Sequence, residues 1–195
     1  SDVYKRQFGL TTEISWLELS DLNHPLLRRM QIQAPGTFHH SLIVASLAES
    51  AAEAIGADAL MSRVCAYFHD IGKLKKPEYF IENQGGENPH DGLTPTMSAL
   101  IIVAHVKDGV DMAIKDKLNP RILEVIREHH GDSLVYYFYR KARERLSEEE
   151  NRGKEEGVEV DDLPKVDEKS FRYPGPIPQS RESGIISLAD AIESA

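Results

Sequence analysis

Apolar residues recur at steps of three and four along most of the chain up to about residue 146, and no segment shows the strict alternation of a strand. The first long helix is predicted to begin at Thr37, a suitable N-cap, and to end at Gly56. The next helix is predicted from about Ala59 to His69, with the chain turning at Gly72. Each of these helices carries its apolar side chains on one face. The hydrophobic pattern therefore predicts an all-α fold.

Capping residues followed by proline mark two further helix starts. Thr94-Pro95 and Asn119-Pro120 each combine a side chain that caps a helix with a proline at the first helical position. Another helix is predicted from Ser133 to Leu146, and a last helix carries apolar residues from Ile185 to Ile192. Residues 77–93 contain several prolines and glycines, so they are predicted to form a long ordered loop.

The composition of the chain changes after residue 147. Residues Glu148 to Lys169 are dense in charge, include Gly153, Gly157 and Pro164, and hold few large apolar side chains. This composition predicts a solvated, mobile excursion, because so few apolar groups cannot offset the entropy lost on ordering. Order is predicted to return at residues 171–176. A length of 195 residues suits one domain, which we place at residues 16–195, after a lead or tether at residues 1–15.

Charge narrows the classes of partner. Twenty-three basic against thirty-two acidic residues give a net charge of −9, which disfavours broad electrostatic capture of DNA, RNA or an anionic membrane. A phosphate-containing ligand would therefore need metal ions or a few well-placed cations. The apolar runs are far shorter than the roughly 18 residues of a membrane helix, so no span is predicted in this sequence. Cys65 is the single cysteine and is predicted to be a small core residue, which fits a reducing compartment.

Histidines at predicted helix ends and on helix faces are the main clue to chemistry. Five of the eight histidines lie beside apolar residues at such positions: His40, His69, His105, His129 and His130. Asp70 directly follows His69, and a carboxylate there can bridge two ions while the neighbouring imidazole binds one. A single histidine on an apolar face is more often an ordinary core residue, but burying adjacent pairs without a metal would demand several matched hydrogen bonds. Spacing alone therefore leaves a metal site and a hydrogen-bonded core both open.

The local sequences around these histidines resemble a known superfamily. His69-Asp70-Ile71-Gly72-Lys73 resembles the signature of the HD phosphohydrolases, and His40-Ser41-Leu42-Ile43-Val44 resembles their earlier histidine motif. The resemblance covers residues 16–195 and implies an all-α HD-domain helical bundle with a dinuclear metal site. More narrowly, several segments in the same order are similar to the cytoplasmic HD domain of the seven-transmembrane HD family, which contains cyclic-di-AMP phosphodiesterases: residues 34–41, 88–93, 105–109, 129–131, 137–142 and 171–176.

This resemblance also implies a set of metal ligands. One ion would be held by His40, His69, Asp70 and Asp190, and the second by Asp70, His105, His129 and His130. Asp190 is included because residues 187–193 resemble the closing helix of the family. His40 is preferred to the adjacent His39 because it directly precedes the Ser-Leu-Ile-Val run, and His24 and His90 match no ligand position. Imidazole and carboxylate ligands suit divalent iron, manganese and zinc, and the two ions expected at this site are iron or manganese.

The activity that the resemblance implies is a metal-dependent phosphodiesterase, which hydrolyses cyclic-di-AMP to linear 5′-pApA as two metals activate a bridging water. Asp70 would be the central catalytic carboxylate. Lys73, three residues later, is the candidate catalytic residue that contacts the substrate phosphate, and an ordinary surface lysine is the alternative. Aromatic side chains available to adenine, each of which also suits a place in the core, are Tyr136, Tyr137, Phe171 and Tyr173.

Two alternative functions remain open. One is an HD hydrolase of another cyclic or phosphorylated nucleotide, and the other is a module that senses a nucleotide without hydrolysing it. The complete set of seven candidate ligands disfavours a non-catalytic module. The His-His pair is followed by Gly131-Asp132-Ser133-Leu134 and by no Gly-Tyr-Pro element, which argues against cyclic-di-GMP as the main substrate.

The resemblance further implies a cellular setting. The chain would be a cytoplasmic domain of a bacterial membrane protein, anchored through helices outside this sequence and making no direct membrane contact itself. Its partner would be the cyclic dinucleotide, with no DNA or RNA polymer, and the sequence carries no signal of an oligomeric state.

Overall fold

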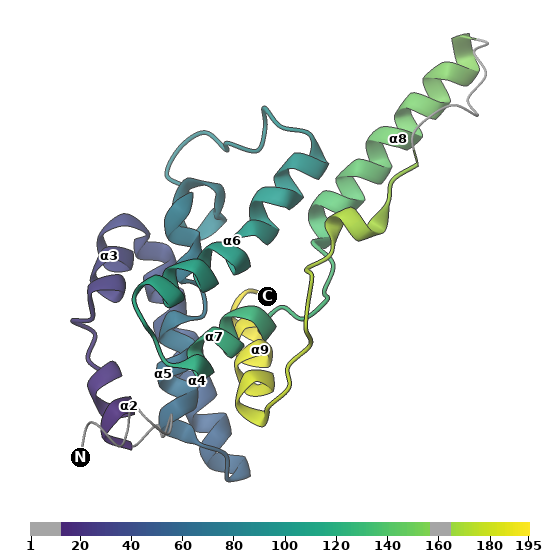
Figure 1. The fold of residues 1–195 in the computed structure, drawn as a ribbon. Coiled ribbons are helices and arrows are strands. Elements are labelled where there is room, and N and C mark those ends of the chain that lie inside the picture. The colour runs from purple at the N-terminus through teal and green to yellow at the C-terminus, as the bar shows by residue number, and fades with distance from the viewer. Residues whose placement is uncertain (1–12, 157–164) are drawn as a thin grey trace.

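The computed structural model describes residues 13–156 and 165–195, which form a bundle of α-helices joined by loops and short 3₁₀ helices (Figure 1). Within these two ranges the only extended pairing is an isolated bridge between Leu134 and Arg172, so the predicted all-α fold is confirmed. The α-helices are α2 (Glu13–Leu19), α3 (Pro25–Gln33), α4 (Pro35–Ile55), α5 (Ala59–Phe68), α6 (Pro95–Lys115), α7 (Pro120–Glu128), α8 (Tyr136–Glu156) and α9 (Arg181–Glu193). The 3₁₀ helices are η1 (Ile71–Lys75), η2 (Pro77–Tyr79), η3 (Ile81–Asn83) and η5 (Glu168–Phe171).

Two predicted helix starts are confirmed in detail. The side chain of Thr94 accepts a hydrogen bond from the backbone N–H of Met97, and Pro95 is the first residue of α6. The side chain of Asn119 accepts one from the backbone N–H of Arg121, and α7 begins at the next proline. Both starts are local, because the cap and the proline are consecutive in the sequence.

The start of α4 differs from the prediction that Thr37 is its N-cap. The helix begins at Pro35, and Ala34 at the cap position offers no side-chain hydrogen bond. The free backbone N–H groups of Gly36 and Thr37 instead donate to Asn83 Oδ1, at 2.9 and 3.2 Å. The prediction was wrong because the cap is supplied by the loop of residues 77–93, which lies far away in the sequence.

The end of α8 also differs from the prediction. The helix continues to Glu156, whereas the sequence pattern ended it at Leu146. The added residues are mostly Glu, Arg and Lys, which are strong helix formers. The first part of the predicted excursion at 148–169 is therefore helical and η5 lies at its end, while residues 157–164 lie outside the described residues.

Two short helices near the amino-terminal side were not predicted. α2 begins inside the predicted lead of residues 1–15, of which residues 1–12 lie outside the described residues. α3 begins at Pro25, and His24 caps it because His24 Nδ1 accepts a hydrogen bond from the backbone N–H of Leu26. A polar residue followed by proline is the same start signal as in α6 and α7, with histidine in place of threonine or asparagine.

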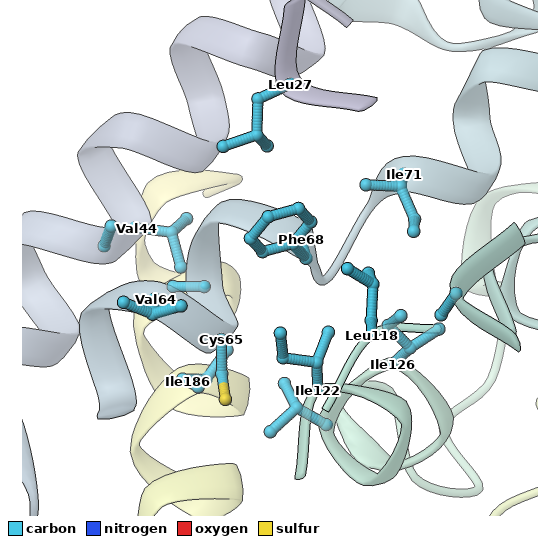
Figure 2. Packing of buried hydrophobic residues seen from close by; sticks show 14 of the residues in the cluster. Leu27, Val44, Val64, Cys65, Phe68, Ile71, Leu118, Ile122, Ile126 and Ile186 are labelled. Atoms are coloured by element: carbon cyan, nitrogen blue, oxygen red, sulfur yellow. The ribbon is translucent and has the colours of Figure 1, made fainter. Parts of the chain in front are cut away.

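The main core lies where α4 and α5 pack against each other and against α7 and α9 (Figure 2). Val64, Cys65 and Phe68 of α5 are fully buried at its centre, which confirms the predicted core position of the cysteine. Burial of a side chain as large as Phe68 contributes roughly 1.5–3 kcal/mol to folding. Around these side chains lie Leu27, Val44, Ile71, Leu118, Ile122, Ile126 and Ile186. This core fixes the ends of α5 and α7, which are followed by His69-Asp70 and by His129-His130.

α8 extends away from the rest of the bundle (Figure 1). Its first turns are held by a small second cluster of Ala99, Phe138 and Phe171, which joins α6, α8 and η5. Val166 packs on the edge of this cluster, so the chain is ordered again before residue 171. None of the described helices is both long enough and apolar enough to cross a membrane.

Candidate metal centre

Seven side chains converge at one place between the helices, in two sets. In the first set, His40 comes from α4, His69 follows α5 and Asp190 lies on α9. The second set comprises Asp70, His105 of α6, and the pair His129-His130, which follows α7. Within each set the candidate ligand atoms lie within 4.8 Å of one another. The structure thus brings together all the residues that the sequence analysis proposed as ligands, the second set being Asp70, His105, His129 and His130.

Asp70 lies between the two sets. Its Oδ2 atom is 3.6 Å from His40 Nε2 and 3.4 Å from His69 Nε2, both in the first set. Its Oδ1 atom is 3.3 Å from His105 Nε2 and 3.6 Å from His129 Nε2, both in the second. One carboxylate therefore presents one oxygen to each set.

Asp190 reaches both sets as well. Its Oδ1 atom is 3.1 Å from His40 Nε2, and its Oδ2 atom is 3.7 Å from Nδ1 of His130. The sequence analysis assigned Asp190 to the first ion alone. The contact with His130 arises because α7 and α9 pack against each other, a relation that no local motif reveals.

Close backbone packing at Gly72 places His69 and Asp70 opposite α6. A Cβ atom at Gly72 would lie 1.8 Å from the carbonyl oxygen of His105 and 2.6 Å from the backbone nitrogen of Gly109. Any side chain at Gly72 would therefore force η1 away from α6. The glycine of the His69-Asp70-Ile71-Gly72 motif thus allows Asp70 and His105 to come within 3.3 Å of each other.

Backbone carbonyls orient three of the histidines. His69 Nδ1 lies 2.7 Å from the carbonyl oxygen of Ala66, and His105 Nδ1 lies 2.6 Å from that of Ile102. His129 Nδ1 makes the same contact with the residue three positions before it, at 2.9 Å. Since a carbonyl only accepts, each Nδ1 carries a hydrogen, and in the neutral imidazole each Nε2 then offers a lone pair to the cluster.

The Nε2 atoms of these histidines are placed to bind a cation. His105 Nε2 and His129 Nε2 lie 3.4 Å apart, so two lone pairs face each other unless a proton or a metal ion lies between them. His40 Nε2, His69 Nε2 and Asp70 Oδ1 are buried and have no hydrogen-bond partner. Leaving such atoms unsatisfied in a native interior is costly. The donor set therefore fits divalent metal ions, the cofactor class that HD domains bind.

Burial and neighbouring charges shift the pKa values in the cluster. Burial disfavours the charged form of Asp70, but the positive charges around it, led by Lys73, hold the pKa of that carboxyl well below its usual value. Burial opposes protonation of His40, but the contact with Asp190 and the other nearby carboxylates raises its pKa to about 9. Burial and the adjacent imidazoles together hold the pKa of His130 well below its usual value. An ionised Asp70 and a neutral His130 are the forms that bind metals.

Lys73, the candidate phosphate contact, is bound to carboxylates. Its Nζ lies 2.7 Å from Asp70 Oδ2 and 2.9 Å from Glu82 Oε1. The same Glu82 oxygen accepts a hydrogen bond from the hydroxyl of Thr37 at 2.9 Å. An ammonium group has three N–H donors, so one remains after these two contacts. The sequence analysis did not identify Glu82, which has the appearance of a surface loop residue in the sequence.

The remaining histidines take structural positions. His90 Nε2 lies 2.9 Å from the carbonyl oxygen of Tyr79, as expected for a loop residue that is no ligand. His24 caps α3, and His39 belongs to neither set.

The four aromatic candidates separate into three groups. Tyr173 stacks on His130, with ring centroids 4.2 Å apart and an angle of 25° between the rings. Phe171 is a core residue, and Tyr136 and Tyr137 are exposed. Beside the cluster a pocket of about 420 Å³ is lined by Phe80, Glu82, His90, Ile102 and Tyr137 among others, and Phe80 also meets His105 edge to face.

The fold is an all-α bundle, and its His-Asp pair lies among further histidines and an aspartate of the last helix. These features define the class of HD domains. The chain belongs to the HD domain family. The sequence model of that family matches residues 37–195.

Individual relatives are similar over nearly the whole chain. The sequence is 45% identical over 193 residues to the cyclic-di-AMP phosphodiesterase PgpH of Bacillus subtilis (strain 168), which covers 98% of this chain and 25% of that protein. It is 42% identical over 194 residues to the cyclic-di-AMP phosphodiesterase PgpH of Listeria monocytogenes, which covers 99% of this chain. The chain therefore spans 25% of the length of both relatives.

A solved structure is similar as well. The crystal structure of the L. monocytogenes phosphodiesterase PgpH HD domain in complex with cyclic-di-AMP superposes with a TM-score of 0.77. The two sequences are 43% identical, and the match covers 90% of this chain and 74% of that one.

Proposed function

We propose that this chain is a metal-dependent phosphodiesterase domain that hydrolyses cyclic-di-AMP to linear 5′-pApA. The observation that carries the proposal is the position of Asp70, whose two oxygens face two separate sets of metal-ligand side chains. Two adjoining cation sites suit the hydrolysis of a phosphodiester, an anion that resists attack by water. The similarity to PgpH phosphodiesterases and to the HD domain bound to cyclic-di-AMP supports this substrate.

The proposed metal ligands are the seven residues of the two sets. His40, His69, Asp70 and Asp190 would hold one ion, and the second would be held by Asp70, His105, His129 and His130. When bound, two divalent ions supply positive charge for the phosphate oxygens and lower the pKa of water for nucleophilic attack. Iron or manganese is the proposed identity, because both accept mixed imidazole and carboxylate ligands.

Other side chains of the cluster would act on the substrate directly. Lys73 is proposed to contact a phosphate oxygen through its remaining N–H donor while its ion pair with Asp70 holds that carboxylate in place. Tyr173 keeps its proton because burial raises the pKa of its phenol, so it offers a hydroxyl donor beside His130. These groups bring local positive charge and donors to a site in a chain of net charge −9.

The neighbouring pocket would receive a base of the dinucleotide. It adjoins Lys73 through Phe80, whose ring centroid lies 5.1 Å from the lysine Nζ. Its aromatic side chains offer planar faces for stacking. A phosphate at the metal sites and a base in this pocket would place the two parts of a nucleotide side by side.

The cellular setting is also proposed from the relatives. Since the chain spans 25% of the length of the PgpH relatives, further segments would belong to the full protein. We propose that those segments anchor the protein in the bacterial cell membrane and hold this domain in the cytoplasm, without direct membrane contact by the domain.

The decisive experiment is hydrolysis by the purified chain with added manganese or iron. The substrates are cyclic-di-AMP, cyclic-di-GMP and a cyclic mononucleotide, with products separated by chromatography. We expect pApA from cyclic-di-AMP and much slower turnover of the others. Preferred cleavage of another nucleotide would replace the substrate assignment, and tight binding of cyclic-di-AMP with no product would identify a sensing module.

A further inference from the structure

We infer that Glu193 is a positioning residue for the metal centre: its carboxylate holds the His40 imidazole so that Nε2 faces the first set. His40 Nδ1–H donates a hydrogen bond to Oε2 of Glu193. On the opposite side of the ring, His40 Nε2 lies 3.1 Å from Asp190 Oδ1 and 3.6 Å from Asp70 Oδ2. The ring is thus held from one edge and presents its other nitrogen to the cluster.

The contrast with the other histidines makes the role of Glu193 specific. His69, His105 and His129 each bind a backbone carbonyl three residues earlier through Nδ1, and that partner comes with the helix. For His40 the partner is a side chain 153 positions away, on a different helix. A mutation can therefore remove the orienting partner of His40, whereas those of the other three belong to the main chain.

The position of Glu193 on α9 is unfavourable for the helix itself. It is the last residue of α9, where the negative end of the helix dipole repels a carboxylate. Asp190 lies three residues earlier, so both carboxylates project from the same side of the helix. The local cost at Glu193 is offset by the contact with His40, which α9 reaches because it packs against α4.

The chemical effect of this pair is also specific. A carboxylate that accepts the Nδ1 hydrogen fixes the tautomer of a histidine and makes its Nε2 a stronger electron-pair donor to a metal. Removal of such a partner typically weakens metal binding by about 10- to 100-fold. The inference rests on the proposed metal centre, and it adds a residue that touches neither metal nor substrate.

The test is a calorimetric titration of metal-free protein with manganese alone. We expect Glu193→Ala to weaken one of two binding events by about 10-fold or more and to leave the other nearly unchanged. Glu193→Gln keeps an oxygen acceptor for Nδ1–H without the charge, so it should restore part of the lost affinity. If Glu193→Ala does not fold, the manganese affinity of Glu193→Gln alone still tests the inference, since this substitution removes the charge of the side chain and keeps its shape.

A matched control lies on the same helix. Glu182 accepts a hydrogen bond from the backbone N–H of Asp58 at 3.1 Å, so Glu182→Ala should weaken the attachment of α9 without touching His40. Both manganese affinities should remain at the parent values in this variant. Parent-like affinities in Glu193→Ala and Glu193→Gln, or an equal loss in Glu182→Ala, would overturn the inference. Because the readout is metal binding, a parent protein that binds two ions but does not hydrolyse cyclic-di-AMP would contradict only the proposed function.

Discussion

Among single residues, Asp70 combines an ion pair with Lys73 and contacts with both sets of candidate ligands. It is buried, and it offers one oxygen to each set. His105, by contrast, belongs to the second set alone. Substitution of Asp70 and substitution of His105 should therefore affect metal binding and turnover in different ways.

Asp70→Ala is expected to abolish essentially all turnover of cyclic-di-AMP, because both sets lose the Asp70 carboxylate. His105→Ala should weaken one ion only, so excess manganese should partly restore its turnover. The measurement is metal content by elemental analysis together with hydrolysis across a manganese titration. Asp91→Ala, an exposed aspartate in the loop, is the control and should behave as the parent. Two-ion occupancy with near-normal turnover in Asp70→Ala would contradict the shared role.

His24 gives a prediction about pH and stability. Partial burial lowers its pKa, with Asp116 acting weakly in the opposite sense, and neutral Nδ1 must accept the hydrogen bond that caps α3. The unfolded chain therefore protonates His24 at a higher pH than the folded chain does. The contribution of this residue to stability is full above about pH 6.5 and declines as the pH falls below that value.

His24→Asn keeps a cap acceptor that does not titrate, so the variant should lose less stability than the parent between about pH 7 and pH 5. Urea unfolding of both proteins at several pH values in this window measures the difference. Equal losses of unfolding free energy in parent and variant would show that His24 does not contribute.

At the scale of elements, two helix starts were predicted correctly where the cap lies next to the helix. Thr94 and Asn119 are such caps, and α6 and α7 begin where the sequence places them. Thr37 failed as a cap because Asn83 reaches the start of α4 from a distant loop. A pattern along the chain reports neighbours in sequence, and it cannot reveal which loop will fold back onto a helix end.

The same distinction applies to the site. The proposed ligands could be named from the sequence because each lies in a short motif, and the structure brings the seven side chains together. Glu82 and Glu193 were missed, since Glu82 contacts Thr37 and Glu193 contacts His40 across long stretches of sequence. Only the spacing of Glu193 from Asp190, three residues on one helix, offered a signal beforehand.

Gly72→Ala tests the close contact between η1 and α6. The added methyl group would meet the His105 carbonyl at 1.8 Å, so the two elements must separate. We expect a loss of roughly 1–3 kcal/mol or more in unfolding free energy, together with weaker manganese binding because Asp70 and His105 move apart. Gly85→Ala is the matched control, since nothing lies within 4 Å of its added Cβ. Unchanged stability and metal affinity in Gly72→Ala would show that the contact has no role in the site.

At the scale of the whole molecule, the charged end of α8 and the candidate metal centre lie on different parts of the fold. The cluster joins α4, α6 and α9 with the ends of α5 and α7, whereas α8 extends away from the bundle (Figure 1). Val166 and η5 pack against α8 and α6, so the dispensable part of the predicted excursion should end before them.

Replacing residues 153–164 by a Gly/Ser linker of equal length should keep the fold and most of the turnover, because this segment has few large apolar side chains to bury. Thermal unfolding and cyclic-di-AMP hydrolysis of the variant are the measurements. Replacing Phe171 by alanine serves as the positive control for damage, since that side chain is buried in the second cluster. A large loss of melting temperature or turnover in the linker variant would mean that the segment packs on the domain.

The pairing of His40 on α4 with Asp190 on α9 has a consequence for how the domain survives in a cell. An ion held by both helices acts as a clamp between segments that lie far apart in the sequence, and it binds only while they are docked. Such a ligand raises the free energy of unfolding by about 2.7 kcal/mol when its free concentration is ~100 times its dissociation constant. Scarcity of metal would then increase the fraction of molecules with α9 detached and open to proteases. The supply of divalent metal would in that way regulate the abundance of the protein as well as its activity.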